Sequence, residues 1–382
     1  MLALGRVAGR PRITRLWRPK LPWHQSLLWS SLVPAATLYW GVVGVRAAWW
    51  RVAWMRQRAQ RLKVISIGNL TVGGNGKTPF SLYLANLLAE LGVQSAIVSR
   101  GYGGRSSQRA QLVAEHGELK VSPDEAGDEA VMMAKSFAGP IAVAPRRYDA
   151  IRMLEQRPEL QVVVLDDAFQ HVRLERDLNL LLIIGDYGFG NGWLLPAGPM
   201  RERVRAIRRA DAVVVLDSAG QGAELPQAVL AKISERPVLR GLLQPRAIVR
   251  PRSGEWEELP LGTVAGRSVL AISGIARVQS FYAMLHRLEA ILVDTLEYPD
   301  HHRYTWADWQ TISRSARNAE FVVTTEKDLV KLERFPFARD SLCALRLGVD
   351  MGHSRPELIK LLLDRCAGDQ ETLQPAAATA TD

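Results

Sequence analysis

Residues 64–78 read VISIGNLTVGGNGKT, in which an apolar run leads directly into a glycine-rich loop and the start of an amphipathic segment. Backbone N–H groups of such a loop turn toward phosphate oxygens at the positive end of the following helix. Lys77 supplies a mobile cation for the β- and γ-phosphates, and the hydroxyl of Thr78 can ligate Mg²⁺. The consensus has glycine where this chain has Thr71. The stretch predicts a P-loop that binds a nucleoside triphosphate through Thr71, Val72, Gly73, Gly74, Asn75, Gly76, Lys77 and Thr78.

An acidic pair is the expected companion of this loop. The apolar run Val162–Leu165 ends in Asp166 and Asp167. A strand that ends in aspartate is often only a turn cap, but in a P-loop protein that carboxylate can hold the Mg²⁺ that the loop hydroxyl also touches. We therefore expect a metal site formed by Thr78, Asp166 and Asp167.

Short apolar runs alternate with helical segments after Lys63, and a second alternation starts near Val238. This alternation is typical of a mostly parallel sheet with crossover helices. The expected fold class is α/β, a P-loop NTPase-type sheet with helices on both faces and a second, smaller α/β lobe. The predicted strands are 64–67, 96–99, 141–144, 162–165, 180–184, 212–216, 269–272, 292–296, 321–324 and 342–347; the predicted helices are 78–91, 123–137, 147–156, 278–288 and 306–316, and 111–121 is predicted to be a hairpin.

At 382 residues the chain is expected to form more than one lobe, because single cores stop growing below this length. The expected parts are a basic, Trp-rich N-terminal segment (1–62), the P-loop core (63–225), the second lobe (226–366) and a disordered tail without apolar periodicity (367–382). The cysteines, Cys343 and Cys366, are too few for a disulfide framework and fit a reducing compartment.

Positive charge and tryptophan are both concentrated at the N-terminal end. Of the 49 Lys and Arg residues, 13 precede Glu90, the first acidic residue, and seven of the 11 Trp lie at or before position 54. Nucleic acid and anionic lipid both attract positive charge. Indole, however, prefers the membrane–water interface. We therefore expect a membrane surface as a partner and no nucleic acid.

Residues 21–45 contain no charged side chain and are long enough on paper to span a bilayer. Proline and polar residues dilute the first half, and a span would carry six basic residues across the bilayer. The favoured interpretation is one or more helices lying in the interface; a single span and a helix packed on the protein are the alternatives. The apolar residues that recur at steps of three and four, as on one helical face, are Trp29, Val33, Ala36, Trp40, Val43, Ala47, Trp50 and Trp54.

Two further clusters offer acid–base chemistry. In SPDEAGDE, residues 122–129, Ser122 and Glu125 form a capping box, and Asp128 follows one turn later. In YPDHHRY, residues 298–304, His301 could accept a proton while a carboxylate orients the ring. Each also has an ordinary interpretation, a solvated helix face for Asp128 and an exposed loop for the histidine. The lysine of Thr325–Asp328 is out of register for a guanine-binding motif, so the sequence does not argue for guanine.

The motifs GNLTVGGNGKTP, SRGYGG, AGDE, LDDAFQH, LLPAGPMRE, PDHHRY and TTEKD occur in the order seen in the tetraacyldisaccharide 4′-kinases of lipid A biosynthesis. The chain resembles that family from its N-terminal hydrophobic segment to about Asp328. The resemblance implies ATP and Mg²⁺ as cofactors and transfer of the γ-phosphate to the 4′-hydroxyl of a tetraacylated glucosamine disaccharide 1-phosphate. It also implies a place on the cytoplasmic face of the inner membrane, where that lipid lies.

The resemblance implies site residues as well. The catalytic Asp–His dyad of the family falls on Asp128 and His301. Its metal carboxylates fall on Asp166, Asp167 and Glu202, the last of these in LLPAGPMRE. Arg100 and Tyr102 in SRGYGG are expected to contact phosphate or sugar. Two other classes stay open: a P-loop ATPase or GTPase coupled to delivery or insertion at the membrane, and a membrane-associated binding protein without catalysis.

Overall fold

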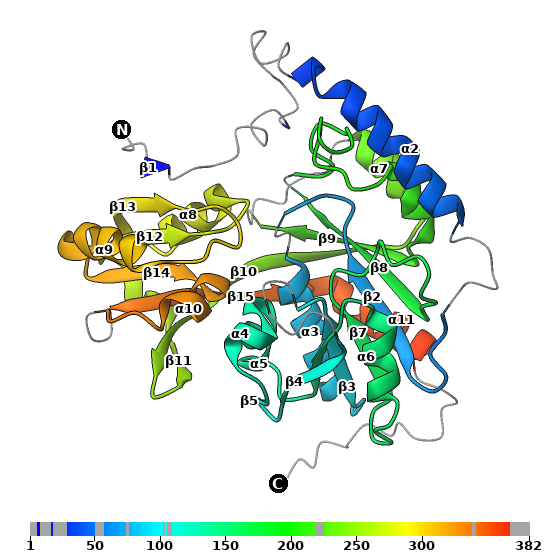
Figure 1. Ribbon diagram of the computed structural model, residues 1–382, viewed down its shortest axis with the longest axis horizontal. Helices are drawn as coiled ribbons and strands as arrows, with labels where there is room; N and C mark the ends of the chain where they lie inside the picture. Colours follow the sequence, from blue (N-terminus) through cyan, green and yellow to red (C-terminus); the bar gives the residue numbers. More distant parts are fainter. Residues whose placement is uncertain are drawn as a thin grey trace.

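The computed structural model describes residues 6–7, 17, 29–49, 57–73, 76–101, 104, 109–185, 187–218, 225, 227–337 and 341–366. Within these residues, 15 strands form one continuous sheet that runs through the molecule with helices on both sides (Figure 1). Its order is β1-β13-β12-β14-β15-β10-β9-β8-β2-β7-β3-β6-β4-β5, with β11 paired to β10. Most neighbouring strands are parallel, so the predicted α/β fold class is confirmed.

The P-loop half of the sheet consists of strands that are parallel to their neighbours from β9 to β6. The antiparallel pair β4 and β5 closes this edge, which confirms the predicted hairpin. Because the strands are parallel, the carboxyl ends of β2 and β7 lie at the same edge. The bounds are β2 Lys63–Gly68, β3 Ser95–Ser99, β4 Gln111–Glu115, β5 Glu118–Leu119, β6 Ile141–Val143, β7 Val162–Leu165, β8 Leu178–Ile184 and β9 Ala212–Asp217.

Two long strands connect this half to the second lobe. β10 (Val238–Arg252) is parallel to β9 on one side and antiparallel to β15 (Leu342–Asp350) on the other. The second lobe therefore continues the same sheet, and its independence at the expected boundary near residue 226 stays a prediction. The remaining strands are β1 Arg6–Val7, β11 Glu255–Leu259, β12 Ser268–Ser273, β13 Ile291–Glu297 and β14 Phe321–Thr325.

Alternate residues of the central strands face different helical layers. Ile65 packs in one core with Phe80 of α3, whereas Val64 packs in another with Ile151 of α6. This arrangement follows from the two-residue period of a strand. The helices are α3 Lys77–Glu90, α4 Pro123–Ala126, α5 Asp128–Ala134, α6 Arg147–Leu154, α7 Gln227–Ile233, α8 Val278–Arg287, α9 Trp306–Ser315, α10 Glu326–Leu332 and α11 Arg355–Cys366.

The helix predicted over 123–137 is wrong in one respect, because it is broken at Gly127. This glycine has φ 85° and ψ 153°, which separates α4 from α5. The capping box of Ser122 and Glu125 is present at the start of α4. Asp128 therefore begins a new helix instead of lying one turn inside the first, and the chain turns at the point where a candidate catalytic residue stands.

Helix α2 (Val33–Trp49) lies along the outside of the P-loop half, beside α7 (Figure 1). Ala36, in the stripe expected to face lipid, is buried, and the indole N–H of Trp29 donates to the carbonyl of Ala197 at 2.7 Å. Trp29 and Ala36 therefore face the protein, as does Tyr39, which packs against the cluster that contains Ile183, whereas Trp40 of the same stripe is 46% exposed. Within the part of the chain that the structure describes, no helix has the length and apolar character needed to cross a bilayer.

The opposite face of α2 is apolar and exposed. Leu38 is 72%, Val42 59%, Val45 69% and Trp49 61% exposed, and their spacing of four, three and four places them on one ridge. We refer to these four residues as the α2 ridge. Trp50 and Trp54, the last two residues of the apolar pattern that begins at Trp29, lie outside the described residues, as does the tail 367–382.

Candidate active site

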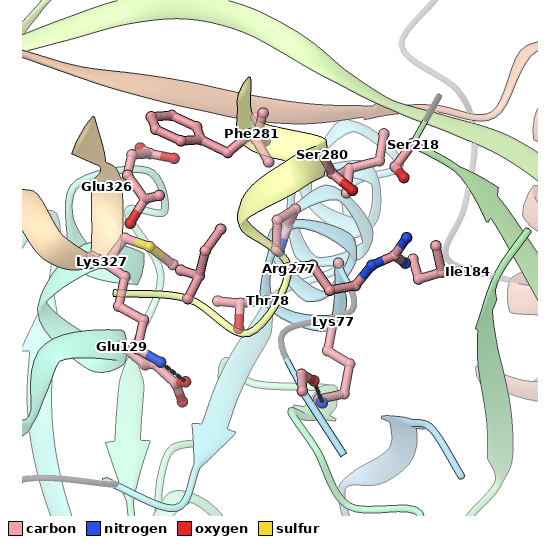
Figure 2. A pocket seen from close by; sticks show the side chains of 18 of the residues that line it. Lys77, Thr78, Glu129, Ile184, Ser218, Arg277, Ser280, Phe281, Glu326 and Lys327 are labelled. Carbon is pink, nitrogen blue, oxygen red and sulfur yellow. Dashed lines mark hydrogen bonds and ion pairs between the residues drawn. The ribbon is translucent and has the colours of Figure 1, made fainter. Parts of the chain in front are cut away.

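A cavity of about 270 Å³ opens where the P-loop half meets the second lobe. Lys77 and Thr78 enter it from the start of α3, and Ser280 and Phe281 of α8, with Arg277 directly before that helix, face it (Figure 2). Further lining residues come from both halves of the molecule: Asp166, Asp167, Arg201, Asp300, His301 and Lys327. The cavity therefore brings together groups from motifs that are far apart in the sequence.

The P-loop has the geometry expected for phosphate. Gly76 has φ 69° immediately before α3, a left-handed conformation that glycine adopts without a steric cost. The ammonium of Lys77 is 3.2 Å from the carbonyl oxygen of Gly73 and 3.6 Å from Oδ1 of Asp167. A lysine folded back onto its own loop is available to exchange these contacts for phosphate oxygens. Gly74 and Asn75 lie outside the described residues.

Thr71 and Val72 hold the loop in place. The N–H of Val72 donates to the carbonyl of Pro199 at 2.8 Å, and Thr71 pairs with Met200 as an isolated antiparallel bridge. Neither residue is among those that line the cavity. These contacts tie the P-loop to the LLPAGPMRE segment, and they place Arg201 beside the acidic pair.

Asp166 is the best-placed candidate for a metal ligand. Its Oδ2 accepts a hydrogen bond from the Thr78 hydroxyl at 3.2 Å, and its Oδ1 accepts one from Ser81 at 2.9 Å. The side chain is 3% exposed. Burial, with the nearby carboxylates of Glu129 and Asp167, raises the pKa of Asp166 to about 6, although Lys77 opposes the shift. A cation beside this carboxylate would offset the desolvation cost of its negative charge.

Asp167 has a different environment. Burial favours its neutral form, but the positive charges of Lys77 and Arg201 outweigh this and lower its pKa. One guanidinium nitrogen of Arg201 is 2.9 Å from Oδ1. The φ of Asp167 is 49°, an uncommon value for a non-glycine residue, and strained backbone of this kind is concentrated at functional sites.

The donor set fits Mg²⁺ without enclosing it. Among the described residues, no group of three or more His, Cys, Asp or Glu is arranged to hold a metal. Mg²⁺ commonly takes one or two carboxylates from the protein and completes its shell with phosphate oxygens and water. The adjoining oxygens of Thr78 and Asp166 match that pattern.

Two expected residues lie elsewhere, and a third is not described. Glu202 is 5% exposed and accepts a hydrogen bond from Arg209 at 2.7 Å, outside the set that lines the cavity. Arg100 follows β3 as an exposed residue and does not line the cavity. Tyr102 lies outside the described residues.

His301 reaches the cavity from the loop after β13. Its φ is 60°, again in the left-handed region. Its Nε2 is 3.0 Å from Nζ of Lys327, which is also 3.0 Å from Oδ1 of Asp300. Burial and the charge of Lys327 lower the pKa of His301, so the neutral ring is favoured. His302 instead contacts Asp308 at 3.0 Å and stacks on Tyr298.

Asp128 stands at the first position of α5, with its Oδ2 3.6 Å from Nζ of Lys331. It is not among the lining residues, but its negative charge partly opposes the lowering of the His301 pKa. The adjacent Glu129 does line the cavity, and its carboxylate is 3.7 Å from Nζ of Lys327 (Figure 2). Burial raises the pKa of Glu129.

Sequence reasoning missed several residues of this site: Glu129, Arg201, Arg277, Lys327 and Lys331. Three of them lie inside motifs quoted from the sequence above, and Glu129 belongs to AGDE. Arg201 lies inside LLPAGPMRE, next to the residue taken as a ligand. Lys327 lies inside TTEKD, another of the motifs that carry the family resemblance. Arg277 has no comparable signal.

Comparison with known proteins gives a consistent result. A family model described as tetraacyldisaccharide-1-P 4′-kinase matches residues 28–367. The tetraacyldisaccharide 4′-kinase of Syntrophus aciditrophicus is 37% identical over 356 residues, which cover 90% of this chain and 94% of the relative. That of Aeromonas hydrophila is 34% identical over 323 residues, covering 85% and 88%. A solved structure of LpxK from Aquifex aeolicus in complex with ATP matches with a TM-score of 0.72 at 31% identity, covering 89% of this chain and 99% of that one.

Proposed function

Because this chain belongs to the tetraacyldisaccharide-1-P 4′-kinase family, we propose that it is a lipid kinase that transfers the γ-phosphate of ATP to the 4′-hydroxyl of a tetraacylated disaccharide 1-phosphate. The observation that carries this proposal is the cavity that unites Lys77, Thr78 and Asp166 with His301. Lys77, Thr78 and Asp166 are suited to bind a nucleotide phosphate and its metal ion. His301 is suited to accept the proton of an acceptor hydroxyl.

The nucleotide would be held by the P-loop half. Lys77 would exchange its contact with the Gly73 carbonyl for phosphate oxygens, and Arg201 would keep Asp167 ionised beside it. Thr78 and Asp166 would hold Mg²⁺, with Asp167 close by; when bound, the ion neutralises phosphate charge during transfer. Glu202 accepts a hydrogen bond from Arg209, so it would ligate the ion only after giving up that contact.

The acceptor would meet its base across the cavity. The hydroxyl oxygen forms a bond to the γ-phosphorus as the bond to the β–γ bridging oxygen breaks, and ADP leaves. The hydroxyl proton passes to the Asp128–His301 pair. The lowered pKa of His301 keeps its ring neutral and able to accept this proton, and Asp128 stabilises the imidazolium that forms. Arg100 and Tyr102, which follow β3 in the sequence, are candidates for contacts to sugar or phosphate.

The α2 ridge is the proposed contact with the membrane. Four apolar side chains on one helical face, Leu38, Val42, Val45 and Trp49, would otherwise be hydrated. The guanidinium of Arg203 stacks 3.6 Å over the ring of Trp40 at the margin of this face, where it can meet lipid phosphate. We infer a peripheral or monotopic enzyme on the cytoplasmic face of the inner membrane.

Turnover of ATP with and without lipid tests this function. A kinase of this kind should hydrolyse ATP slowly alone and form ADP in step with phosphorylated lipid once the disaccharide 1-phosphate is added in detergent micelles. A variant with Lys77→Ala is the control for contaminating activity. ATP hydrolysis at full rate without lipid, with no phosphorylated lipid formed, would instead support an ATPase coupled to delivery at the membrane.

A further inference from the structure

Helix α10 is the element that connects the two sides of the proposed acid–base pair. It begins directly after β14, where the Thr325 hydroxyl accepts a hydrogen bond from the N–H of Asp328 at 3.3 Å. The carboxylate of Asp328 is fully buried and accepts the N–H of Gly274, the residue after β12, at 2.8 Å. These contacts fix α10 to the second lobe.

From this fixed base, α10 presents two lysines to the P-loop half. Lys327 and Lys331 are four residues apart and therefore lie on one face of the helix. They meet two successive carboxylates at the start of α5: Lys331 is 3.6 Å from Asp128, and Lys327 is 3.7 Å from Glu129. Both lysine side chains are largely buried: that of Lys331 is 10% exposed and that of Lys327 is 15% exposed.

Lys327 also contacts the histidine loop. Its Nζ is 3.0 Å from both Nε2 of His301 and Oδ1 of Asp300. A protonated lysine only donates hydrogen bonds, so Nε2 accepts and the ring proton lies on Nδ1. For Nε2 to accept a proton from substrate, Lys327 must move toward Asp300 or Glu129, which it already contacts.

We propose that α10 positions the acid–base pair, with Lys327 holding the His301 loop against Glu129 and Lys331 holding Asp128. The two lysines act through the pair, and we assign them no contact with the transferred phosphate or the acceptor hydroxyl. This inference rests on the proposed function, because it assigns the pair a task in phosphoryl transfer. Lys331 is also 3.1 Å from Oδ1 of the buried Asp328, so it links the anchored start of α10 to Asp128.

The variants Lys327→Met and Lys327→Arg test the first contact. The charged groups that face His301 are Lys327 and Lys331 from α10, Asp300 beside it and Asp128 from α5. Removing the Lys327 charge should therefore move the acidic limb of the kcat–pH profile to higher pH. We expect kcat to fall about tenfold or more, short of the ~10²–10⁴-fold that loss of a general base costs. KM for ATP should change little, and Lys327→Arg should recover most of the loss.

Lys331→Met should also lower kcat with little change in KM for ATP. The matched control is Lys135→Met, because Lys135 lies at the other end of α5 and donates to the carbonyl of Gly254 in the second lobe at 2.6 Å. It should keep wild-type kcat and pH profile. Wild-type kcat and an unchanged acidic limb in folded Lys327→Met would overturn the proposal.

A measurement without substrate separates this inference from the function itself. The titration of the His301 ring, followed by NMR and assigned with His301→Gln, should shift to higher pH in Lys327→Met and not in Lys135→Met. If the wild-type protein forms no phosphorylated lipid, the proposed function fails while this titration still reports on Lys327. An unshifted ring with full lipid kinase activity in wild type would reject the positioning role alone.

Discussion

The hydroxyl of Thr78 donates to Oδ2 of Asp166 at 3.2 Å and so joins the first turn of α3 to the end of β7. The two oxygens come from motifs far apart in the chain, and the parallel pairing of β2 with β7 brings them to one edge of the sheet. This relationship is the basis of the proposed metal site.

Replacing Lys77 or Thr78 by alanine should remove most kinase activity and leave the fold intact. Among the residues that the structure describes, the Lys77 ammonium contacts Asn69, Gly73 and Asp167, all of them around the phosphate cradle. Activity and thermal unfolding of each variant check this. Wild-type turnover by folded Lys77→Ala would contradict the P-loop assignment.

Asp166→Asn should stabilise the ligand-free protein and inactivate it. The pKa of Asp166 is raised from 3.8 to about 6, so the folded state favours the protonated form and its ionisation opposes folding above pH 6. A neutral amide avoids a cost on the order of 1–3 kcal/mol. The gain in thermal stability should be full above about pH 6 and fade as the pH falls toward 3.8, where both states are protonated.

Thermal melts at several pH values, with Asp124→Asn on the exposed start of α4 as control, measure this gain. Asp124→Asn should leave stability nearly unchanged at every pH. A destabilised Asp166→Asn protein at pH 7.5 would show that the buried charge is better compensated than its surroundings indicate.

Polar substitution of the α2 ridge, Leu38, Val42, Val45 and Trp49 to Ser or Gln, should release the protein from vesicles of phosphatidylethanolamine and phosphatidylglycerol. Apolar insertion is unaffected by salt, so high salt alone should weaken wild-type binding only in part. Co-sedimentation measures both effects. The control is Ile291→Ser with Val293→Ser, two exposed apolar residues of β13, which should bind as wild type. Complete release of wild type by salt would mean that the ridge does not insert.

Alanine at Asp128 or at His301 should each lower kcat about 10²–10⁴-fold with ATP affinity nearly intact. Because the two residues act as a unit, the double variant should be little worse than either single one. His302→Ala should be much milder, since that ring packs against Asp308 and Tyr298. Steady-state kinetics of the four variants check this, and multiplicative losses would mean that the residues are wrongly paired.

Much of the fold followed from sequence periodicity. Strands β2, β7 and β9 are continuous buried runs, so their positions were readable to within one residue. The break at Gly127 could not be predicted from the sequence, because a single glycine inside a helical pattern is usually tolerated. Helix α10 was missed because it is short and follows β14 without a loop, and its start depends on Thr325 and Asp328.

The site could be predicted only as separate motifs. The P-loop and the acidic pair can be recognised from short stretches of sequence. The ion pairs of Lys327 and Lys331 cannot, because they depend on how the two lobes meet. The stripe on α2 shows a related limit. Trp29 and Ala36 have the spacing of an exposed apolar face, but α2 is apolar on two sides, and periodicity alone cannot say which side meets the protein.

The most direct test of the central claim is the identity of the product. Purified protein would be incubated with γ-labelled ATP, Mg²⁺ and the tetraacylated disaccharide 1-phosphate, and the lipid would be extracted and examined by phosphorus and proton NMR. The account predicts that label enters the lipid and that the new phosphate is attached at the 4′ position. Label that appears only as inorganic phosphate, or a phosphate on another hydroxyl, would contradict it.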